Sequence, residues 1–180
     1  MAVSSTLASL RLDLVPFCDK HLTETYVGWL KDKSVTRYSE QRHRVHTLAS
    51  CRAYAEEFAS NSSYFWAIIE KETSLGHIGN ITAAVDKNNF VADLSIMIGN
   101  PAARGKGYGS EAWRRACRYL LSDAGMRKVT AGTMAANAPM LAVMRASGMI
   151  EEGRRIRYFL HETGEVDLVL AAITRPPRMN

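Results

Sequence analysis

Apolar side chains recur at helical spacing in four segments of the chain. The clearest is Gly109–Ala124, in which one stripe is apolar and the arginines face away from it. The same spacing predicts helices at Cys18–Lys31 and Thr47–Phe58, and a fourth helix that Asn137 begins and Gly148 ends. Asn is a favoured residue at the start of a helix and Gly just after its end, so the sequence defines both ends of the fourth helix.

Shorter apolar or alternating segments between these helices predict β-strands. They are Leu7–Leu14, Tyr64–Glu70, Leu75–Val85, Phe90–Gly99, Val129–Met134, Ile150–Leu160 and Val166–Ile173. The order β-α-α-β-β-β-α-β-α-β-β predicts an α/β domain with a mixed central sheet, not a doubly wound one. We expect one domain over residues 1–174, with about seven strands and about four helices, followed by a frayed tail at 175–180.

The strand at Phe90–Gly99 is followed by a loop rich in glycine and basic residues. Asn100-Pro101 closes the strand, and Arg104-Gly105-Lys106-Gly107-Tyr108-Gly109-Ser110 leads into the longest helix. The unpaired N–H groups of a first helical turn and the helix dipole favour an anion, and glycines let a phosphate approach the backbone closely. The loop therefore predicts a phosphate-binding site.

Two common phosphate-binding loops do not match this segment. The P-loop has the spacing G-x-x-x-x-G-K followed by Ser or Thr, whereas five residues separate Gly99 from Gly105 here and Gly107 stands at the hydroxyl position. The dinucleotide fingerprint requires a glycine at Ser110 and a place in the first strand–helix unit of the sheet. The P-loop interpretation is therefore rejected, and the dinucleotide interpretation has little support.

Arg104, Gly107 and Gly109 do satisfy a third pattern, R/Q-x-x-G-x-G/A. Between a strand and a helix, this pattern resembles the acyl-CoA loop of the GNAT superfamily of N-acetyltransferases, and the resemblance extends from Leu7 to Ile173. The chain is also similar to the branch that contains ribosomal-protein alanine and amino-sugar acetyltransferases. The resemblance implies the GNAT fold, splayed between its fourth and fifth strands, and transfer of acetyl from acetyl-CoA to a primary amine.

The resemblance also assigns residues to the acetyl-CoA site. In this family the pantetheine arm fills the gap between the splayed strands, so backbone groups of Met97 and Ile98 would pair with its amides, and one N–H would stabilise the developing oxyanion. Arg104 and Lys106 would add charge near the phosphates, and Asn137 matches a helix-capping Asn that contacts the cofactor arm. The pyrophosphate would lie on the amides of Gly105, Lys106, Gly107, Tyr108, Gly109 and Ser110.

An alkyl amine must lose a proton before it attacks a thioester, since its pKa lies near ~10.4. Asp93 is the first candidate general base, because Ala92-Asp93-Leu94 parallels an Ala-Glu-Ile sequence whose carboxylate has this role in relatives. His77, on a neighbouring strand, is the second. A hydrogen-bonded structural role is the alternative for both residues.

The departing thiolate needs stabilisation or a proton. The family's usual general acid is a Tyr seven positions after the capping Asn, and Met144 occupies that position. Tyr158, Ser147 or a water would then supply the proton, or the thiolate would leave without one, since a thiol pKa is about 8.5.

The basic loop between the first two predicted helices is the expected acceptor site. Its positive charge suits an anionic acceptor such as a nucleotide-linked amino sugar, although a solvated basic loop has the same composition. The alternatives are a protein N-terminus, as in the ribosomal-protein alanine acetyltransferases, and a non-catalytic acyl-CoA-binding regulator. The candidate acceptor residues are Arg37, Tyr38, Gln41, Arg42 and His43.

Composition adds few constraints. The net charge of +5 fits an anionic ligand, but no segment resembles a base-reading helix, and no apolar run approaches the ~20 residues of a membrane span. Three scattered cysteines without a CxxC motif, and no secretory signal, predict a cytoplasmic protein with reduced thiols. His43 and His46 lack the further ligands of a zinc site, so no metal is expected. A homodimer is left open.

Overall fold

The computed structural model describes residues 5–175, which form one eight-stranded sheet and five α-helices. The strands are β1 (Leu7–Ala8), β2 (Leu12–Pro16), β3 (Tyr64–Glu70), β4 (His77–Asp86), β5 (Val91–Ile98), β6 (Lys128–Met134), β7 (Ile150–His161) and β8 (Gly164–Thr174). The helices are α1 (Glu24–Lys31), α2 (Lys33–Thr36), α3 (Leu48–Ser60), α4 (Tyr108–Ser122) and α5 (Ala138–Ala146). The predicted α/β class with a mixed sheet is confirmed, with one more strand and one more helix than expected.

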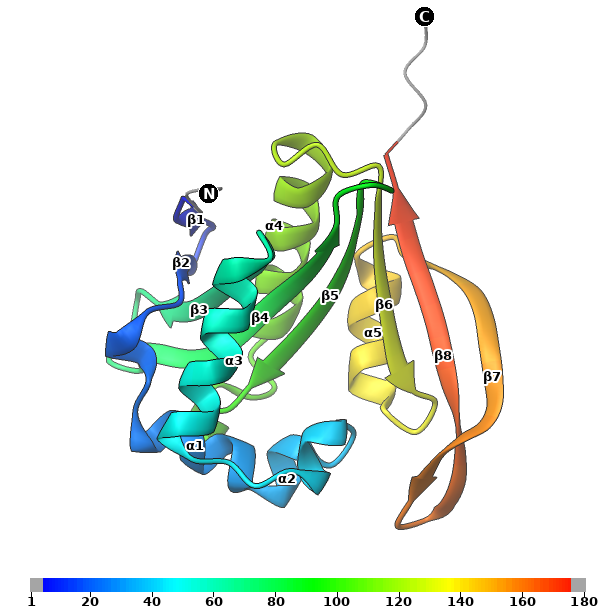
Figure 1. The fold of residues 1–180 in the computed structure, drawn as a ribbon, viewed down its shortest axis with the longest axis horizontal. Coiled ribbons are helices and arrows are strands. Elements are labelled where there is room, and N and C mark those ends of the chain that lie inside the picture. Colours follow the sequence, from blue (N-terminus) through cyan, green and yellow to red (C-terminus); the bar gives the residue numbers. More distant parts are fainter. Residues whose placement is uncertain (1–4, 176–180) are drawn as a thin grey trace, which may run out of the picture.

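The sheet has the order β1-β2-β3-β4-β5-β6-β8-β7 and opens between β5 and β6 (Figure 1). These two strands are parallel and pair only over 91–93 and 128–130, whereas every other neighbouring pair is antiparallel. Beyond that point β5 stays paired with β4 as far as Ile98, and β6 stays paired with β8 as far as Met134. The predicted splay is therefore confirmed, since β5 and β6 are the fourth and fifth strands of the sequence-based scheme.

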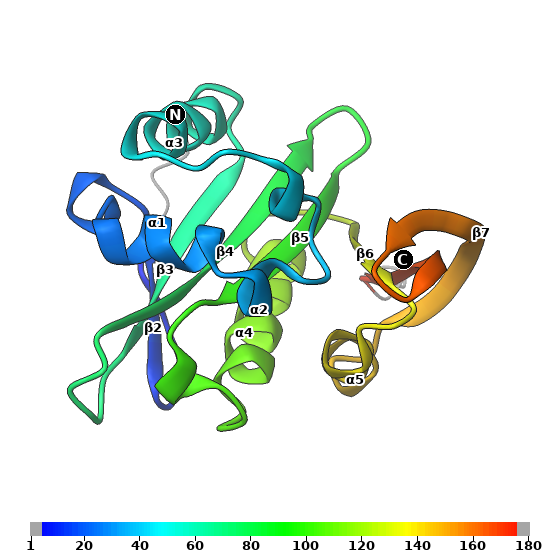
Figure 2. The ribbon, with the colours of Figure 1, turned by 90° about the horizontal axis from the view of Figure 1, so that it is seen from below.

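Helices cover both faces of the sheet (Figure 2). α4 and α5 lie on one face, and α1, α2 and α3 lie on the other. Trp66 of β3 and Trp113 of α4 are fully buried in the core on the first face. Phe65 points to the opposite face, where it packs with residues of α1 and α3, because successive strand residues alternate between faces. β3 is thus buried on both sides, which accounts for its continuous apolar sequence.

The first predicted strand, Leu7–Leu14, is wrong in one respect. It consists of two short antiparallel strands, β1 and β2, in which Leu7 lies opposite Leu14. Ser9 makes the turn between them, because its backbone N–H donates to the Leu12 carbonyl at 2.8 Å, while its hydroxyl donates to Glu111 of α4. A turn fixed by such bonds interrupts the strand, and hydrophobic alternation does not reveal it.

The first predicted helix, Cys18–Lys31, begins later than expected. Thr23 has extended backbone angles and accepts the Tyr26 N–H on its hydroxyl, so α1 starts at Glu24. A short 3₁₀ turn, Asp19–His21, precedes it. The basic loop that follows is also more ordered than predicted, because it contains α2 and a 3₁₀ turn at Glu40–His43.

The C-terminal end of the described chain is tied to the body of the domain. The Arg175 N–H donates to the Arg127 carbonyl at 2.9 Å, and its guanidinium donates to the Leu121 carbonyl at the end of α4. The rest of the predicted tail, 176–180, lies outside the described residues.

Replacement of Leu120 by Ala is expected to lower the free energy of unfolding by about 2–5 kcal/mol. Its side chain is fully buried on the apolar stripe of α4, so the substitution leaves a cavity. Urea unfolding measures the loss. Arg118→Ala, on the exposed face of the same helix, is the matched control and should change stability by less than about 0.5 kcal/mol. Equal losses in both variants would contradict this orientation of α4.

Candidate active site

A cavity of about 860 Å³ lies where β5 and β6 separate. One end is lined by the glycine-rich loop and the start of α4, and its sides are lined by 94–98 of β5 and 132–134 of β6. The other end is lined by α1, α3, the loop at 38–41 and the cleft face of β4. A single cleft therefore connects the predicted phosphate site with the predicted acceptor loop.

The glycine-rich loop presents a row of free backbone donors at the start of α4. Gly105 and Gly107 have φ angles of +74° and +79°, which favour glycine, and Gly107 is the residue that precedes the helix. Within the described residues, the N–H groups of 105–110 donate to no protein acceptor, and the first helical bond of α4 is Glu111 N–H to the Gly107 carbonyl. These donors and the helix dipole make a site for a phosphate.

Arg11, from the turn between β1 and β2, holds this loop in place. Its Nη1 donates to the Lys106 carbonyl at 3.0 Å, and its Nε pairs with the Glu111 carboxylate at 2.8 Å. Its guanidinium also lies over the Tyr108 ring, 4.6 Å from the centroid. The sequence analysis did not assign a role to Arg11, because this contact joins segments about a hundred residues apart.

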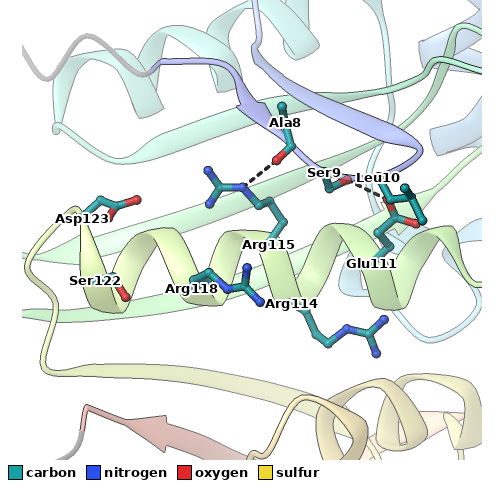
Figure 3. A pocket seen from close by; sticks show the side chains of 9 residues that line it. All are labelled: Ala8, Ser9, Leu10, Glu111, Arg114, Arg115, Arg118, Ser122 and Asp123. Atoms are coloured by element: carbon teal, nitrogen blue, oxygen red, sulfur yellow. Dashed lines mark hydrogen bonds between the residues drawn. The ribbon is translucent and has the colours of Figure 1, made fainter.

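The outer face of α4 carries a separate, shallower depression (Figure 3). Its volume is about 510 Å³, and its lining includes none of the predicted site residues. The hydrogen bonds drawn there run from Arg115 Nε to the Ala8 carbonyl, at 2.9 Å, and from the Ser9 hydroxyl to Glu111, at 2.8 Å. They anchor the β1–β2 turn to α4 and so support the Arg11 contacts with the loop.

Arg104 and Lys106 differ in their placement. The Arg104 guanidinium donates to the Ser34 hydroxyl at 3.2 Å and to the Gly99 carbonyl at 3.3 Å, and it lies 3.9 Å from Asp32. It lines the cleft while bracing the loop against the start of α2. Lys106 is exposed and does not line the cleft. The phosphate-binding roles of both side chains stay predictions.

The backbone of β5 alternates between its two neighbours. The Gly99 N–H donates to the Ile78 carbonyl at 3.0 Å, so the Met97 N–H, two residues earlier, also faces β4. The Ile98 N–H therefore faces the open side toward β6. Both residues line the cleft, but the backbone of Ile98 is the better placed to pair with a ligand there.

Asn137 caps α5, as predicted from the sequence. Its Oδ1 accepts the Met140 N–H at 3.3 Å, and its Nδ2 donates to the Thr133 hydroxyl at 3.0 Å. It lines the β6 side of the cleft. Its side-chain donors and acceptors thus fix the start of α5, and a ligand contact stays a prediction.

Asp93 lies at the last position where β5 and β6 still pair, opposite Thr130. Its Oδ1 accepts the Thr130 hydroxyl at 2.8 Å. Surrounding protein raises the pKa of the Asp93 carboxyl, although the residue keeps an exposed surface, and the Thr130 hydrogen bond acts in the opposite direction. Asp93 shares the strand face of Ser95, which lines the cleft, but it does not line the cleft itself.

His77 lies beneath the cleft in a cluster of aromatic rings. Its ring centroid is 5.0 Å from that of Trp29 and 5.3 Å from that of His21. Burial lowers the pKa of His77 and lowers the pKa of His21 to about 4, so both imidazoles are neutral at pH 7. His77 does not line the cleft but contacts Asn80, which does.

The candidate acids lie away from the cleft. Tyr158 is half exposed on β7 with Arg155 over its ring, and its neighbour Phe159 lines the cleft instead. Met144 is buried in the core, and the Ser147 hydroxyl donates to the Met144 carbonyl at 2.7 Å. The structure therefore does not bring Asp93, His77 and Tyr158 together, and their catalytic roles stay predictions.

The acceptor loop bridges the cleft to the β7–β8 hairpin. Arg37 pairs with Glu162, the Tyr38 ring stacks on His161 at 5.5 Å, and Arg42 donates to the Leu160 carbonyl at 3.1 Å and pairs with Glu40. Much of its positive charge is thus neutralised within the protein. Of the predicted acceptor residues, two line the cleft, Tyr38 and Gln41, and three do not, Arg37, Arg42 and His43.

Several cleft residues were missed by the sequence analysis. In the strand segment His77-Ile78-Gly79-Asn80-Ile81-Thr82, successive side chains alternate between the two faces of the sheet, so Asn80 and Thr82 share a face. This alternation is the sequence signal that would have identified these two residues. Burial raises the pKa of the phenols and of the thiol among these residues, so they are neutral at pH 7. The missed residues are Tyr26, Cys51, Tyr54, Asn80 and Thr82.

The site fits coenzyme A. Free amides at 105–110 suit a diphosphate, and the open edges of β5 and β6 suit a chain that carries its own amides. Across residues 5–175, no group of three His, Cys, Asp or Glu side chains is arranged to hold a metal, and no helix is long and apolar enough to cross a membrane.

Gly109→Val is expected to weaken coenzyme A binding at least tenfold, because branched atoms would occupy the space over the free amides. The fold should tolerate it, since an added Cβ would meet only Ile98 Cγ1, at 3.6 Å, and the φ angle of Gly109 is not positive. Titration calorimetry measures binding. Gly153→Val, at another open glycine position, is the control and should bind normally. Unchanged binding by Gly109→Val would contradict the assignment of the loop.

Comparisons with known proteins agree with this geometry. The family model described as "Acetyltransferase (GNAT) domain" matches residues 11–150. A human alpha/beta-tubulin N-acetyltransferase 9 is 24% identical over 156 residues, which is 79% of this chain and 73% of that protein. The ribosomal-protein-S5-alanine acetyltransferase of Vibrio fischeri superposes with a TM-score of 0.81 at 11% identity, covering 98% of this chain and 100% of its own. Spermidine N-acetyltransferase from Vibrio cholerae, solved with CoA and spermine, superposes with a TM-score of 0.80 at 16% identity. The match covers 91% of this chain and 95% of that chain. The chain belongs to the GNAT acetyltransferase family and is an acetyl-CoA-dependent N-acetyltransferase.

Proposed function

We propose that the acceptor is the α-amino group of a protein or peptide N-terminus. The observation that carries this proposal is the acceptor half of the cleft, which is lined largely by neutral polar and aromatic side chains. Its one carboxylate, Glu40, is paired with Arg42. A polycationic amine would need free carboxylates there, whereas a peptide terminus needs one amine position and neutral partners for its backbone.

The chemistry of the amine supports the same acceptor. An α-amino group has a pKa of about 7.7–8.0, against about 10.4 for a lysine-like amine. A useful fraction is therefore neutral at pH 7 without a strong general base close by. This suits a cleft in which the candidate base, Asp93, lies four residues along β5 from Met97, or about 13 Å of strand.

Two of the similar proteins are named for protein acceptors. The human relative is named for tubulin, and the Vibrio fischeri enzyme is named for an alanine of ribosomal protein S5. These names support a protein acceptor for this chain without identifying it.

Bound acetyl-CoA would supply an acetyl thioester whose carbonyl carbon the amine attacks. The free amides at 105–110 would hold its diphosphate, and the Ile98 N–H would donate toward the thioester oxygen as charge develops there. The proton leaves the amine through water toward Asp93. The hydroxyls of Ser95 and Thr82 lie along this path, because the two residues are opposite one another on β5 and β4. The thiolate takes a proton from water, because Met144 stands at the position where this family usually has a Tyr as general acid.

Arg44 supports a second candidate, a nucleotide-linked amino sugar. It lines the cleft, and no ion pair among the described residues involves it. A free guanidinium at the mouth of the cleft suits a phosphate group. The other basic residues of the loop support this candidate less, because Arg37 and Arg42 are already paired.

A peptide that begins with Ala or Ser is expected to release thiol from acetyl-CoA in a coupled assay, because the cleft accepts a neutral chain end. The same peptide with a blocked α-amine is the matched control and should release none. Turnover with a nucleotide amino sugar alone would favour the second candidate. Stoichiometric coenzyme A binding without turnover on any amine would contradict both.

Asp93→Asn is expected to lower kcat about 10²-fold or more and to remove the acidic limb of its pH profile, since a general base must be deprotonated to act. Thr130→Val gives an independent test. The Thr130 hydrogen bond lowers the pKa of Asp93, so its loss should move the acidic limb to higher pH with the carboxylate still present. An acidic limb that stays in place in both variants would remove Asp93 from the mechanism.

A further inference from the structure

Asn80 is an unusual residue for its place in the sheet. It lies in β4 between apolar neighbours, has only 5% of its surface exposed, and lines the acceptor half of the cleft. Met97 lies directly opposite it on β5, so the two side chains share the face that meets α1 and α3. A carboxamide is thus buried beside the point where the amine and the thioester must meet.

His77 fixes the orientation of this carboxamide. The His77 Nε2 lies 2.9 Å from Asn80 Oδ1 and 3.1 Å from the Gly79 carbonyl oxygen. The Gly79 oxygen can only accept, so Nε2 carries the hydrogen, and the Asn80 atom that faces it must be the oxygen. Burial keeps the pKa of His77 below its ordinary value, so this neutral tautomer persists at pH 7. The Nδ2 of Asn80 consequently points away from His77.

The Nδ2 donor has no partner in the protein. Within the described residues, it is fully buried and donates to no acceptor. Buried amide donors are nearly always satisfied in folded proteins, because an unpaired one loses its hydration without compensation. An unpaired donor on a residue that lines a substrate cleft, held in place by a second side chain, indicates a bond that the substrate completes.

We propose that Asn80 Nδ2 donates to the carbonyl oxygen of the acceptor's first residue, and that His77 is the positioning residue for this bond. The inference rests on the proposed peptide acceptor. Within one residue the α-amine and the carbonyl oxygen are close neighbours, so a bond from β4 to the oxygen would hold the amine over the β5 edge, where the Ile98 N–H faces the cleft. A neutral donor selects a neutral carbonyl, whereas a phosphate or carboxylate would call for a cation.

Access to Nδ2 requires movement of a neighbour. Because Nδ2 has almost no accessible surface, the acceptor would reach it only when a neighbouring side chain turns aside. Met97, directly opposite Asn80 on the same face, is the side chain assigned to this movement. It is partly buried against the cluster that Phe65 forms with residues of α1 and α3, and an unbranched thioether changes rotamer readily. The substrate thus replaces an apolar contact with a hydrogen bond, so an acceptor that carries the carbonyl binds more tightly than one that lacks it.

The test compares two neutral-backbone acceptors: an Ala-initiated peptide, and the same peptide with an E-alkene in place of its first peptide bond, which removes the carbonyl oxygen without adding a basic nitrogen. Asn80→Leu keeps the size of the side chain and removes its donors. It is expected to raise KM for the normal peptide at least tenfold and to change KM for the alkene peptide less than twofold. Coenzyme A affinity should be unchanged. Asn80→Ala serves as a second variant should the Leu variant unfold, with thermal unfolding as the check.

His77 is tested in the same assay. His77→Leu is expected to raise KM for the normal peptide several-fold, because the carboxamide is then free to rotate, whereas His77→Gln retains an N–H donor and should restore much of the affinity. A merely structural role would affect both acceptors equally.

Two failures can be told apart. Equal effects of Asn80→Leu on both peptides, or none on the normal one, would overturn this inference and leave the peptide acceptor standing. A wild-type protein that acetylates neither peptide would overturn the proposed acceptor, and this inference with it.

Discussion

The separation of β5 from β6 is the constraint on which the rest of the structure depends. Each strand keeps its outer partner, β4 or β8, while the two inner edges pair at only three positions. Buried backbone groups without partners are unfavourable, so these open edges are stable only beside solvent or a ligand that carries its own donors and acceptors. The protein thereby has a cleft with open backbone edges on two sides, while α4 packs against both strands and α5 packs against β6.

The phosphate end of the cleft depends on a contact distant in sequence. Gly105 and Gly107 adopt the left-handed conformation that turns the loop amides outward, but Arg11 fixes the loop by bonding the Lys106 carbonyl and the Glu111 carboxylate. Bonds from the β1–β2 turn to α4 support Arg11 in turn. The site is therefore preorganised by charged and polar contacts outside the cleft, and its own donors stay free for the ligand.

The acceptor end of the cleft differs from the phosphate end, because most of the side chains that line it are uncharged. Two arginines of the basic loop bind the β7–β8 hairpin: Arg37 pairs with Glu162, and Arg42 donates to the Leu160 carbonyl. Apart from Arg44, His46 and the paired Glu40, the polar side chains that line this end are uncharged: phenols, a thiol, carboxamides and hydroxyls. His21 and His77, in the aromatic cluster behind this end, are neutral as well. Recognition at this end must then rely on hydrogen bonds and shape, which suits a chain terminus better than a highly charged small molecule.

Local patterns in the sequence were sufficient to predict the helices, most strands and the phosphate loop. Helix caps, glycines and the spacing of hydrophobic residues determine structure within a few residues, so they can be interpreted without the fold. They placed Asn137 at the start of α5 and began α4 at Gly109, one residue after its observed start at Tyr108. They could not foresee that the first strand folds into a pair. Nor could they foresee that Arg37 pairs with Glu162 and Arg42 donates to the Leu160 carbonyl, both more than a hundred residues away, or that His77 lies behind the cleft lining and bonds to Asn80. Those outcomes depend on which elements the fold brings together, and charge, burial and hydrogen bonding are properties of that three-dimensional neighbourhood.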